Sequence, residues 1–387
     1  MHRVRTLRLR PYFMRQLQEA QGTGLLGDGL YNEILRRLEN LLLNFTHLRE
    51  CHIAWYSTDT HLLHGVPTQN LLQKAILSST RLQKLSLVLS LPKLKALLTP
   101  DIIAATLRLH ELEISILPDD GLEMPRSPVE QIVASSLIPL ISQNQRYLTT
   151  FALGASLPLD LSSLFHALTN SPHRLQHLSF SIPCIVPYLG TPHALSSFLN
   201  AHSKSLTRLA LHGSHIDSSE RRRGQATDSD LAHWLNSSFL SFNDTDADAN
   251  PVSLEHLTFS TSFLPIDAAI SCVQRYAQFP SFTSLDLTGR YMSYQQVEKL
   301  FQAGAMLKKL RLGTVSLSPE LVDLLAEKLP VLEEVDLWIR DVRPHKNDVP
   351  VYEMSGASAK RLGRVKKQVQ VQVVSWFLAN LTNFLLC

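Results

Sequence analysis

One six-residue pattern, L-x-x-L-x-L, recurs eleven times along the chain, with Val, Ile, Phe or Cys in place of some leucines. The spacing between copies ranges from 25 to 48 residues. In each copy the last two apolar residues alternate with polar ones, which is typical of a short strand with one buried face. We therefore predict eleven strands, in copies that begin at Val4, Leu48, Leu82, Leu109, Leu148, Leu175, Leu206, Leu254, Phe282, Leu307 and Leu332.

The segments between these strands carry apolar residues at helical spacing. Ser318 before Pro319, and Thr191 before Pro192, are start signals, because proline at the first helical position costs no hydrogen bond. We predict helices over residues 30–43, 69–78, 128–142, 191–202, 228–240, 266–278, 293–303 and 318–329.

A single strand and helix cannot bury their apolar faces alone, whereas stacked copies can. The sequence therefore predicts an α/β fold, a solenoid of about eleven irregular repeats. We expect a curved parallel β-sheet on its concave side and helices on its convex side. In such a solenoid the ladder leucines form the core and specify no function.

The ladder with intervening helices resembles leucine-rich repeat proteins of the ribonuclease-inhibitor-like type. The irregular repeat lengths, with Ser, Thr and His between the leucines, resemble fungal F-box and leucine-rich-repeat proteins. This resemblance covers residues 4–340. The Asn or Cys that usually follows the third leucine is mostly absent, so the turns need another means of stabilisation.

The resemblance implies an F-box, which would bind a cullin-ligase adaptor, ahead of the repeats. Residues 30–41 (LYNEILRRLENL) resemble the L-P-x-E-I-L start of that segment, with Tyr31 in place of the proline. The same residues also fit a repeat helix that leads into the strand after Leu48. The adaptor is therefore a partner only if an F-box is present, here or in a segment outside this sequence.

Two inserts and a tail depart from the repeat pattern. Loop inserts are predicted near residues 118–128 and 214–250, where turn-forming and charged residues dominate. We predict a solenoid domain over residues 1–340 and a basic, then apolar, C-terminal tail or cap over residues 341–387. Its apolar run is shorter than the roughly 20 residues of a membrane span, so no membrane partner is expected.

Charge and cysteine usage limit the function classes. Residues 16–339 carry 24 basic and 31 acidic side chains, which disfavours a nucleic-acid partner. The four cysteines lie far apart, and the N-terminus lacks the apolar region of a signal peptide. We therefore expect a cytoplasmic or nuclear protein.

The sequence has no pattern typical of catalysis or cofactor binding, such as G-x-S-x-G or H-E-x-x-H. His212 and His215 have a ligand-like interval, but no further ligand has supporting spacing. We therefore predict a protein that is not an enzyme and has no cofactor and no metal.

The residues between the ladder leucines point away from the core onto the concave sheet surface, because side chains alternate along a strand. This surface is weakly polar in its middle and charged at its ends. Tryptophan and arginine often dominate interface energetics. A solvated charged face, with the tryptophan packed on the tail, is the alternative. The predicted partner-binding residues lie at the C-terminal end: Lys309, Arg311, Glu334, Asp336 and Trp338.

We therefore expect a non-catalytic scaffold whose concave face binds a protein partner. The resemblance implies a substrate-recognition module like that of F-box and leucine-rich-repeat ubiquitin-ligase receptors. The alternative is a small-GTPase regulator of the ribonuclease-inhibitor-like repeat type. That function would need an Arg or Asn on a turn near one end of the arc, and the sequence singles out none.

Overall fold

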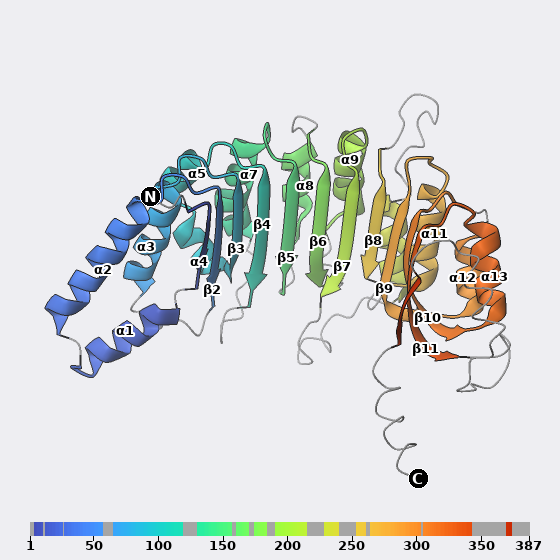
Figure 1. The fold of residues 1–387 in the computed structure, drawn as a ribbon. Coiled ribbons are helices and arrows are strands. Elements are labelled where there is room, and N and C mark those ends of the chain that lie inside the picture. The colour runs from blue at the N-terminus through green and yellow to red at the C-terminus, as the bar shows by residue number, and fades with distance from the viewer. Residues whose placement is uncertain are drawn as a thin grey trace, which may run out of the picture. The chain divides into compact units, whose positions relative to one another are not determined.

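The computed structural model alternates short strands with helices along the chain (Figure 1). Contacts divide the chain into two units, residues 1–205 with 214–225 and residues 206–213 with 226–387. The structure describes residues 4–10, 12–25, 27–56, 65–118, 130–156, 160–169, 174–183, 190–214, 228–239, 253–260, 264–302, 305–342 and 369–373.

The described part of the first unit contains parallel strands that pair in sequence order. The strands are β1 (Thr6–Leu9), β2 (Glu50–Trp55), β3 (Lys84–Ser90), β4 (Glu111–Leu117), β5 (Thr150–Ala155) and β6 (His177–Pro183). The helices are α1 (Tyr12–Gly22), α2 (Asp28–Leu43), α3 (Gly65–Leu77), α4 (Leu91–Leu97), α5 (Pro100–Ala105), the π-helix η3 (Val133–Leu137), α7 (Ile138–Asn144), α8 (Ser162–Thr169) and α9 (Pro192–His202).

The second unit has the same arrangement, and its strands also pair in parallel and in sequence order. The strands are β7 (Arg208–Ser214), β8 (His256–Ser260), β9 (Ser284–Met292), β10 (Lys309–Leu317), β11 (Glu334–Val342) and β12 (Val369–Val373). The helices are α10 (Asp228–Phe239), α11 (Ile266–Tyr276), α12 (Tyr294–Leu300) and α13 (Pro319–Lys328).

The core of each unit is a ladder of stacked leucines. Leu257, Leu285, Leu310 and Val335 occupy matching register positions on four neighbouring strands of the second unit, and all four are buried. The residues between them lie on the opposite face of the sheet, which we call the open face. Helices α11 to α13 lie behind the strands of this unit (Figure 1). The predicted α/β solenoid of leucine-rich-repeat type is confirmed.

Backbone hydrogen bonds link neighbouring repeats at the start of the strands. The carbonyl oxygen of Arg5 accepts from the N–H groups of both Arg49 and Glu50, at 2.8 and 3.0 Å. The same double acceptance recurs between neighbouring repeats in both units, with the carbonyls of Arg49, Gln83, His110, Thr149, Thr207, Glu255, Thr283 and Lys308 as acceptors. The start of each of these strands is therefore fixed by the backbone of the preceding repeat.

Each of the eleven predicted strands is present, and each predicted helical segment contains a helix. The segment 128–142 differs in detail, because it widens into the π-helix η3 before α7. Pro139 is one of the first two residues of α7 and lacks an N–H group for the usual helical bond, which explains the local widening. Ser318 accepts a hydrogen bond from the N–H of Leu321, as its start signal predicted.

Short helices were not predicted, and parts of the tail and inserts lie outside the described residues. The additional helices are α1, α4, α5 and α8. Strand β11 extends to Val342, and β12 pairs in parallel with it. Residues 343–368 and 374–387 are outside the described ranges, as are 119–129, 215–227 and 240–250 of the predicted inserts. The domain boundary at residue 340 stays a prediction.

No helix within the described ranges has both the length and the apolar character needed to cross a bilayer.

Replacing Leu257 by Asp tests the ladder, because this side chain is completely buried. An unpaired buried carboxylate is costly, so we expect L257D to lower the free energy of unfolding by about 4 kcal/mol or more. Urea denaturation followed by circular dichroism measures the change. Ser260→Asp, on the open face of the same strand, is the matched control and should cost less than about 1 kcal/mol. Equal losses in the two variants would contradict the assigned core.

Candidate functional site

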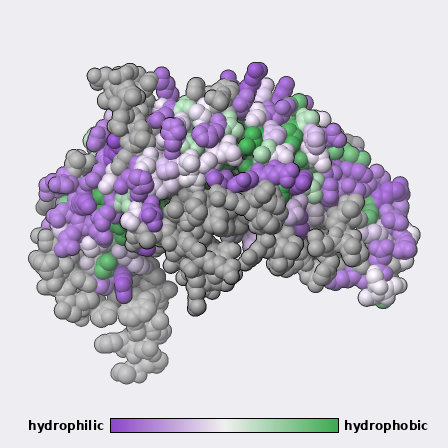
Figure 2. Space-filling view, turned by 180° about the vertical axis from the view of Figure 1, so that it is seen from behind, coloured by the Kyte–Doolittle hydropathy of each residue, from purple (hydrophilic) through white to green (hydrophobic). Residues whose placement is uncertain are grey.

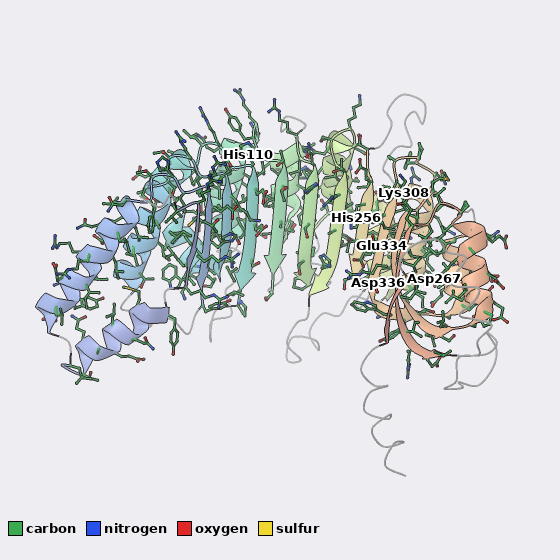
Figure 3. The ribbon with its side chains drawn as sticks, viewed as in Figure 1. His110, His256, Asp267, Lys308, Glu334 and Asp336 are labelled. Carbon is green, nitrogen blue, oxygen red and sulfur yellow. The ribbon has the colours of Figure 1, made fainter. Side chains whose placement is uncertain are left out.

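The predicted binding residues lie together on the open face of β10 and β11. Lys309 and Arg311 come from β10, and Glu334, Asp336 and Trp338 come from β11. Lys309 pairs in register with Glu334, Arg311 with Asp336, and Gly313 with Trp338. Figure 3 shows Glu334 and Asp336 on β11. The structure therefore brings the five residues into one patch, and their binding role stays a prediction.

Arg311 is the centre of this patch. Its Nε donates to Oδ2 of Asp336 at 2.9 Å, and its Nη1 donates to Oδ2 of Asp286 on β9 at 3.4 Å. The hydrogen bond to Asp336 raises the pKa of Arg311, with burial acting against it and Asp286 adding to it. The two aspartates are only 17% and 18% exposed, whereas Arg311 is 49% exposed. One guanidinium thus binds Oδ2 of two mostly buried carboxylates, whereas Oδ1 of each is buried without a hydrogen-bond partner among the described residues.

Asp286 was missed in the sequence analysis, although a signal for it exists. The copies that begin at Phe282, Leu307 and Leu332 are spaced by 25 residues. Asp286, Arg311 and Asp336 therefore hold the same position in three consecutive repeats, and the register confirms the alignment. An acid, base, acid series at one repeat position predicts a cross-strand ion cluster.

Trp338 lies beside this ion cluster. The Arg311 guanidinium carbon is 5.9 Å from the centroid of the Trp338 ring, which is within cation–π range. The Trp338 side chain is half-buried, and its Nε1 is enclosed without a hydrogen-bond partner among the described residues. Gln372 of β12 is its register partner on the far side. The alternative interpretation, in which the indole packs on the tail, stays a prediction.

A backbone bulge next to Trp338 was not predicted. Strands β9 and β10 pair up to Leu287 and Leu312, and pairing resumes at Met292 and Thr314. Residues 288–291 thus stand opposite Gly313 alone, and Gly289 takes a positive φ of 102°. Bulges commonly redirect side chains beside binding sites.

Gly313 is necessary for this bulge. A Cβ atom at position 313 would lie 2.6 Å from the carbonyl oxygen of Arg290, closer than real Cβ contacts. The bulge backbone therefore rests directly on the open face of β10. Arg290 and Tyr291 are exposed at its tip. The bulge and Trp338 therefore lie on either side of the same position, Gly313, at the border of the patch.

The remaining charges of the patch are paired and exposed. Lys309 Nζ lies 2.7 Å from Oε2 of Glu334, and both side chains are more than half exposed. Such pairs contribute only about 0–1 kcal/mol to stability. Lys309 and Glu334 therefore act as the rim of the patch rather than its centre.

His256 is engaged by hydroxyl groups on the same face. Its Nδ1 lies 2.5 Å from Oγ of Ser284, and its Nε2 lies 3.0 Å from Oγ1 of Thr258 (Figure 3). The serine contact is of the kind seen between a nucleophile and a base. Both ring nitrogens are already in use, so the imidazole serves the hydrogen-bond network of the sheet. Within the described ranges, no three His, Cys, Asp or Glu side chains gather as metal ligands.

The first unit has a related ion cluster without a tryptophan. Lys84 of β3 lies 2.9 Å from Glu111 and 2.6 Å from Glu113, both on β4. Burial alone would lower the pKa of Lys84, but the two glutamates outweigh it and raise the pKa. A cation between two carboxylates is therefore a general solution for this open face. Trp338 and the bulge distinguish the patch in the second unit.

A polar groove lies between α12 and α13, on the helix side. Its volume is about 660 Å³, and its lining includes Tyr294, Glu298, Glu320, Asp323 and Glu327. Burial raises the pKa of Tyr294, and the four carboxylates add to the effect. In Figure 2, the described surface at this end of the molecule is mainly hydrophilic. The groove is a solvated surface feature and is separate from the predicted patch.

Gly313→Ala tests the bulge, because the added methyl group meets backbone rather than a flexible side chain. We expect the substitution to lower the free energy of unfolding by about 1–3 kcal/mol, as for other overpacked sites. Gly154→Ala on β5 is the matched control, since its Cβ would lie 3.3 Å from the Ser115 hydroxyl and no closer than 3.7 Å to backbone, which is ordinary contact. Chemical denaturation compares the two variants. A Gly313→Ala protein as stable as Gly154→Ala would show that the bulge does not need this glycine.

No protein-family model matches the sequence, and no curated protein matches it. Solved structures with some similarity include the crystal structure of a protein from Bacteroides fragilis. That protein is 13% identical, with 68% of this chain and 75% of that chain covered, and the TM-score is 0.34. A TM-score this low supports no statement about fold or function.

Proposed function

We propose that the protein is a non-catalytic interaction scaffold that binds a partner protein on the open face of β9, β10 and β11. The observation that carries this proposal is the pairing of Trp338 with Arg311 beside the Gly313 bulge. Tryptophan and arginine are the residue types most enriched among interface hot spots. Solenoids of stacked repeats commonly use their open sheet face for such contacts.

The charged side chains of the patch are already paired with one another, which favours a partner that makes short-range contacts. Asp286 and Asp336 are already bound by Arg311, and Glu334 is bound by Lys309. A partner group that displaced Arg311 or Lys309 from its carboxylate would have to bind that carboxylate itself, because a partly buried carboxylate without a partner is costly. The indole and the outer side of the guanidinium therefore offer the main contact surface, with Lys309 and Glu334 at the rim.

The finer proposal is that the bound partner is a target of ubiquitination, by resemblance to F-box and leucine-rich-repeat receptors. In the structure, residues 30–41 lie within α2, whose inner side packs on α1, α3 and β1. This is the position of a repeat helix. The ligase connection therefore rests on the resemblance, while the scaffold proposal rests on the patch.

Trp338→Ala is the direct test of the patch. We expect it to weaken binding of a recovered partner by at least about 30-fold, since a central tryptophan anchor typically contributes 2 kcal/mol or more. Lys309→Ala, at the rim, should change the affinity by less than about 5-fold. The partner is first recovered by affinity purification of the tagged chain from its native cells, and both variants are then compared by calorimetry. Unchanged affinity in a correctly folded Trp338→Ala protein would remove this patch from consideration.

Affinity purification with mass spectrometry also tests the ligase connection. If the finer proposal holds, a cullin-ligase adaptor is enriched with the tagged chain, and its enrichment is unaffected by Trp338→Ala. Recovery of partners that depend on Trp338, without any adaptor, would contradict the ligase connection and leave the scaffold proposal standing.

A further inference from the structure

Helix α2 has an apolar outer side in addition to its buried inner side. The inner side contributes Leu35, Leu38 and Leu42 to a cluster with Met14 of α1. On the outer side Leu30 is 55% exposed and Leu41 is 53% exposed. The helix lies at the N-terminal end of the first unit (Figure 1). Exposed leucines on one side of a helix indicate a surface that can receive a partner.

The outer residues form a regular seam. Leu30, Ile34, Arg37 and Leu41 follow one another at intervals of four, three and four residues. At 3.6 residues per turn they fall within a wedge of roughly 60° on one side of α2. Alternating intervals of three and four are the spacing of a coiled-coil seam. The outer side of α2 is therefore shaped to receive another helix.

The spacing of this seam also identifies the helix that fits it. The series four, three, four reads the same in both directions along α2. In an antiparallel pair of α2 helices, Leu30 of each copy meets Leu41 of the other, and Ile34 meets Arg37. Every contact then occurs twice, which is the requirement of a two-fold symmetric interface.

The charges near the seam suit this arrangement as well. Arg37 Nε donates to Oε1 of Glu33 at 2.6 Å, and Arg36 also bonds this carboxylate. These neighbours lower the pKa of Glu33, which stays ionised. In the antiparallel pair, Arg37 packs its aliphatic stem on Ile34 of the second copy, close to Glu33 of that copy. The arginine in the seam therefore meets a carboxylate.

We propose that the partner of this face is a second copy of the chain, joined through antiparallel α2 helices about a two-fold axis between Ile34 and Arg37. The seam is small compared with a standard interface of about 1,600 Å². We therefore expect a weak dimer, with a dissociation constant on the order of 10 μM.

Sedimentation equilibrium of the full chain over about 1–200 μM tests the proposal, because a weak dimer forms by mass action. The expected result is a concentration-dependent rise from the monomer mass of 43.5 kDa toward twice that value. Leu41→Asp should raise the dissociation constant by at least about 50-fold, because it places a charge in the seam. A wild-type chain that stays monomeric over the whole range overturns the proposal.

Leu43→Asp is the matched control for Leu41→Asp. Leu43 is 49% exposed, close to the value for Leu41, but it lies about 200° away around the helix. Circular dichroism verifies that both variants keep the fold. We expect Leu43→Asp to dimerise like the wild type. Dimers that survive Leu41→Asp, or that are lost equally in Leu43→Asp, place the interface elsewhere and overturn the proposal.

A cross-link tests the antiparallel register itself. Chains carrying Ile34→Cys are mixed with chains carrying Arg37→Cys and mildly oxidised, and the linked peptides are identified by mass spectrometry. The native Cys51 and Cys272 are buried and do not compete, and Cys184 and Cys387 are replaced by serine in both chains. The expected product joins position 34 to position 37 in the mixture. Preferential linkage of 34 to 34 in the Ile34→Cys chain alone would overturn the two-fold arrangement.

Discussion

The carbonyl oxygen before each of nine described strands accepts two N–H groups from the next repeat, and this contact fixes how neighbouring repeats align. It recurs from Arg5 in the first repeat to Lys308 in the last pair of ladder copies, on either side of the division between the units. Since side chains alternate with a period of two, a slip of one residue would exchange Leu310 with Arg311. The backbone contact and the leucine ladder therefore reinforce the same register. The same alignment therefore determines which residues form the core and which residues lie on the open face.

The main features of the fold could be predicted because they repeat. A pattern that recurs eleven times indicates both where the strands lie and which of their residues are buried. The helices between the strands are indicated by apolar residues at helical spacing. Most of the elements that the sequence did not predict are short helices. Helix α8 has eight residues and α5 has six, too few for a period to stand out. The widening at η3 depends on a single residue, Pro139, and the hydrophobic period of the segment does not indicate its effect.

The candidate patch could be located from sequence, and the 25-residue spacing of Asp286, Arg311 and Asp336 indicates its ion cluster, but the geometry of its contacts could not be predicted. Alternation placed Lys309, Arg311, Glu334, Asp336 and Trp338 on one face. The role of Arg311 as a bridge required the register of three strands, and the bulge required knowing that the backbone of Arg290 rests on Gly313. These are contacts between residues more than twenty positions apart, and a single repeat contains no trace of them.

The charge balance around Arg311 has a consequence for how a partner arrives. The two cations and three carboxylates of the patch leave one net negative charge, which the exposed Arg290 at the tip of the bulge offsets, so the patch projects little field beyond the surface. Long-range attraction raises association rates only where one sign of charge is left over. A partner of this patch therefore meets it at the ordinary rate of about 10⁵–10⁶ M⁻¹s⁻¹, with little dependence on salt. Partners would then be discriminated by their dissociation rates, which depend on contacts with the Trp338 indole and the bulge.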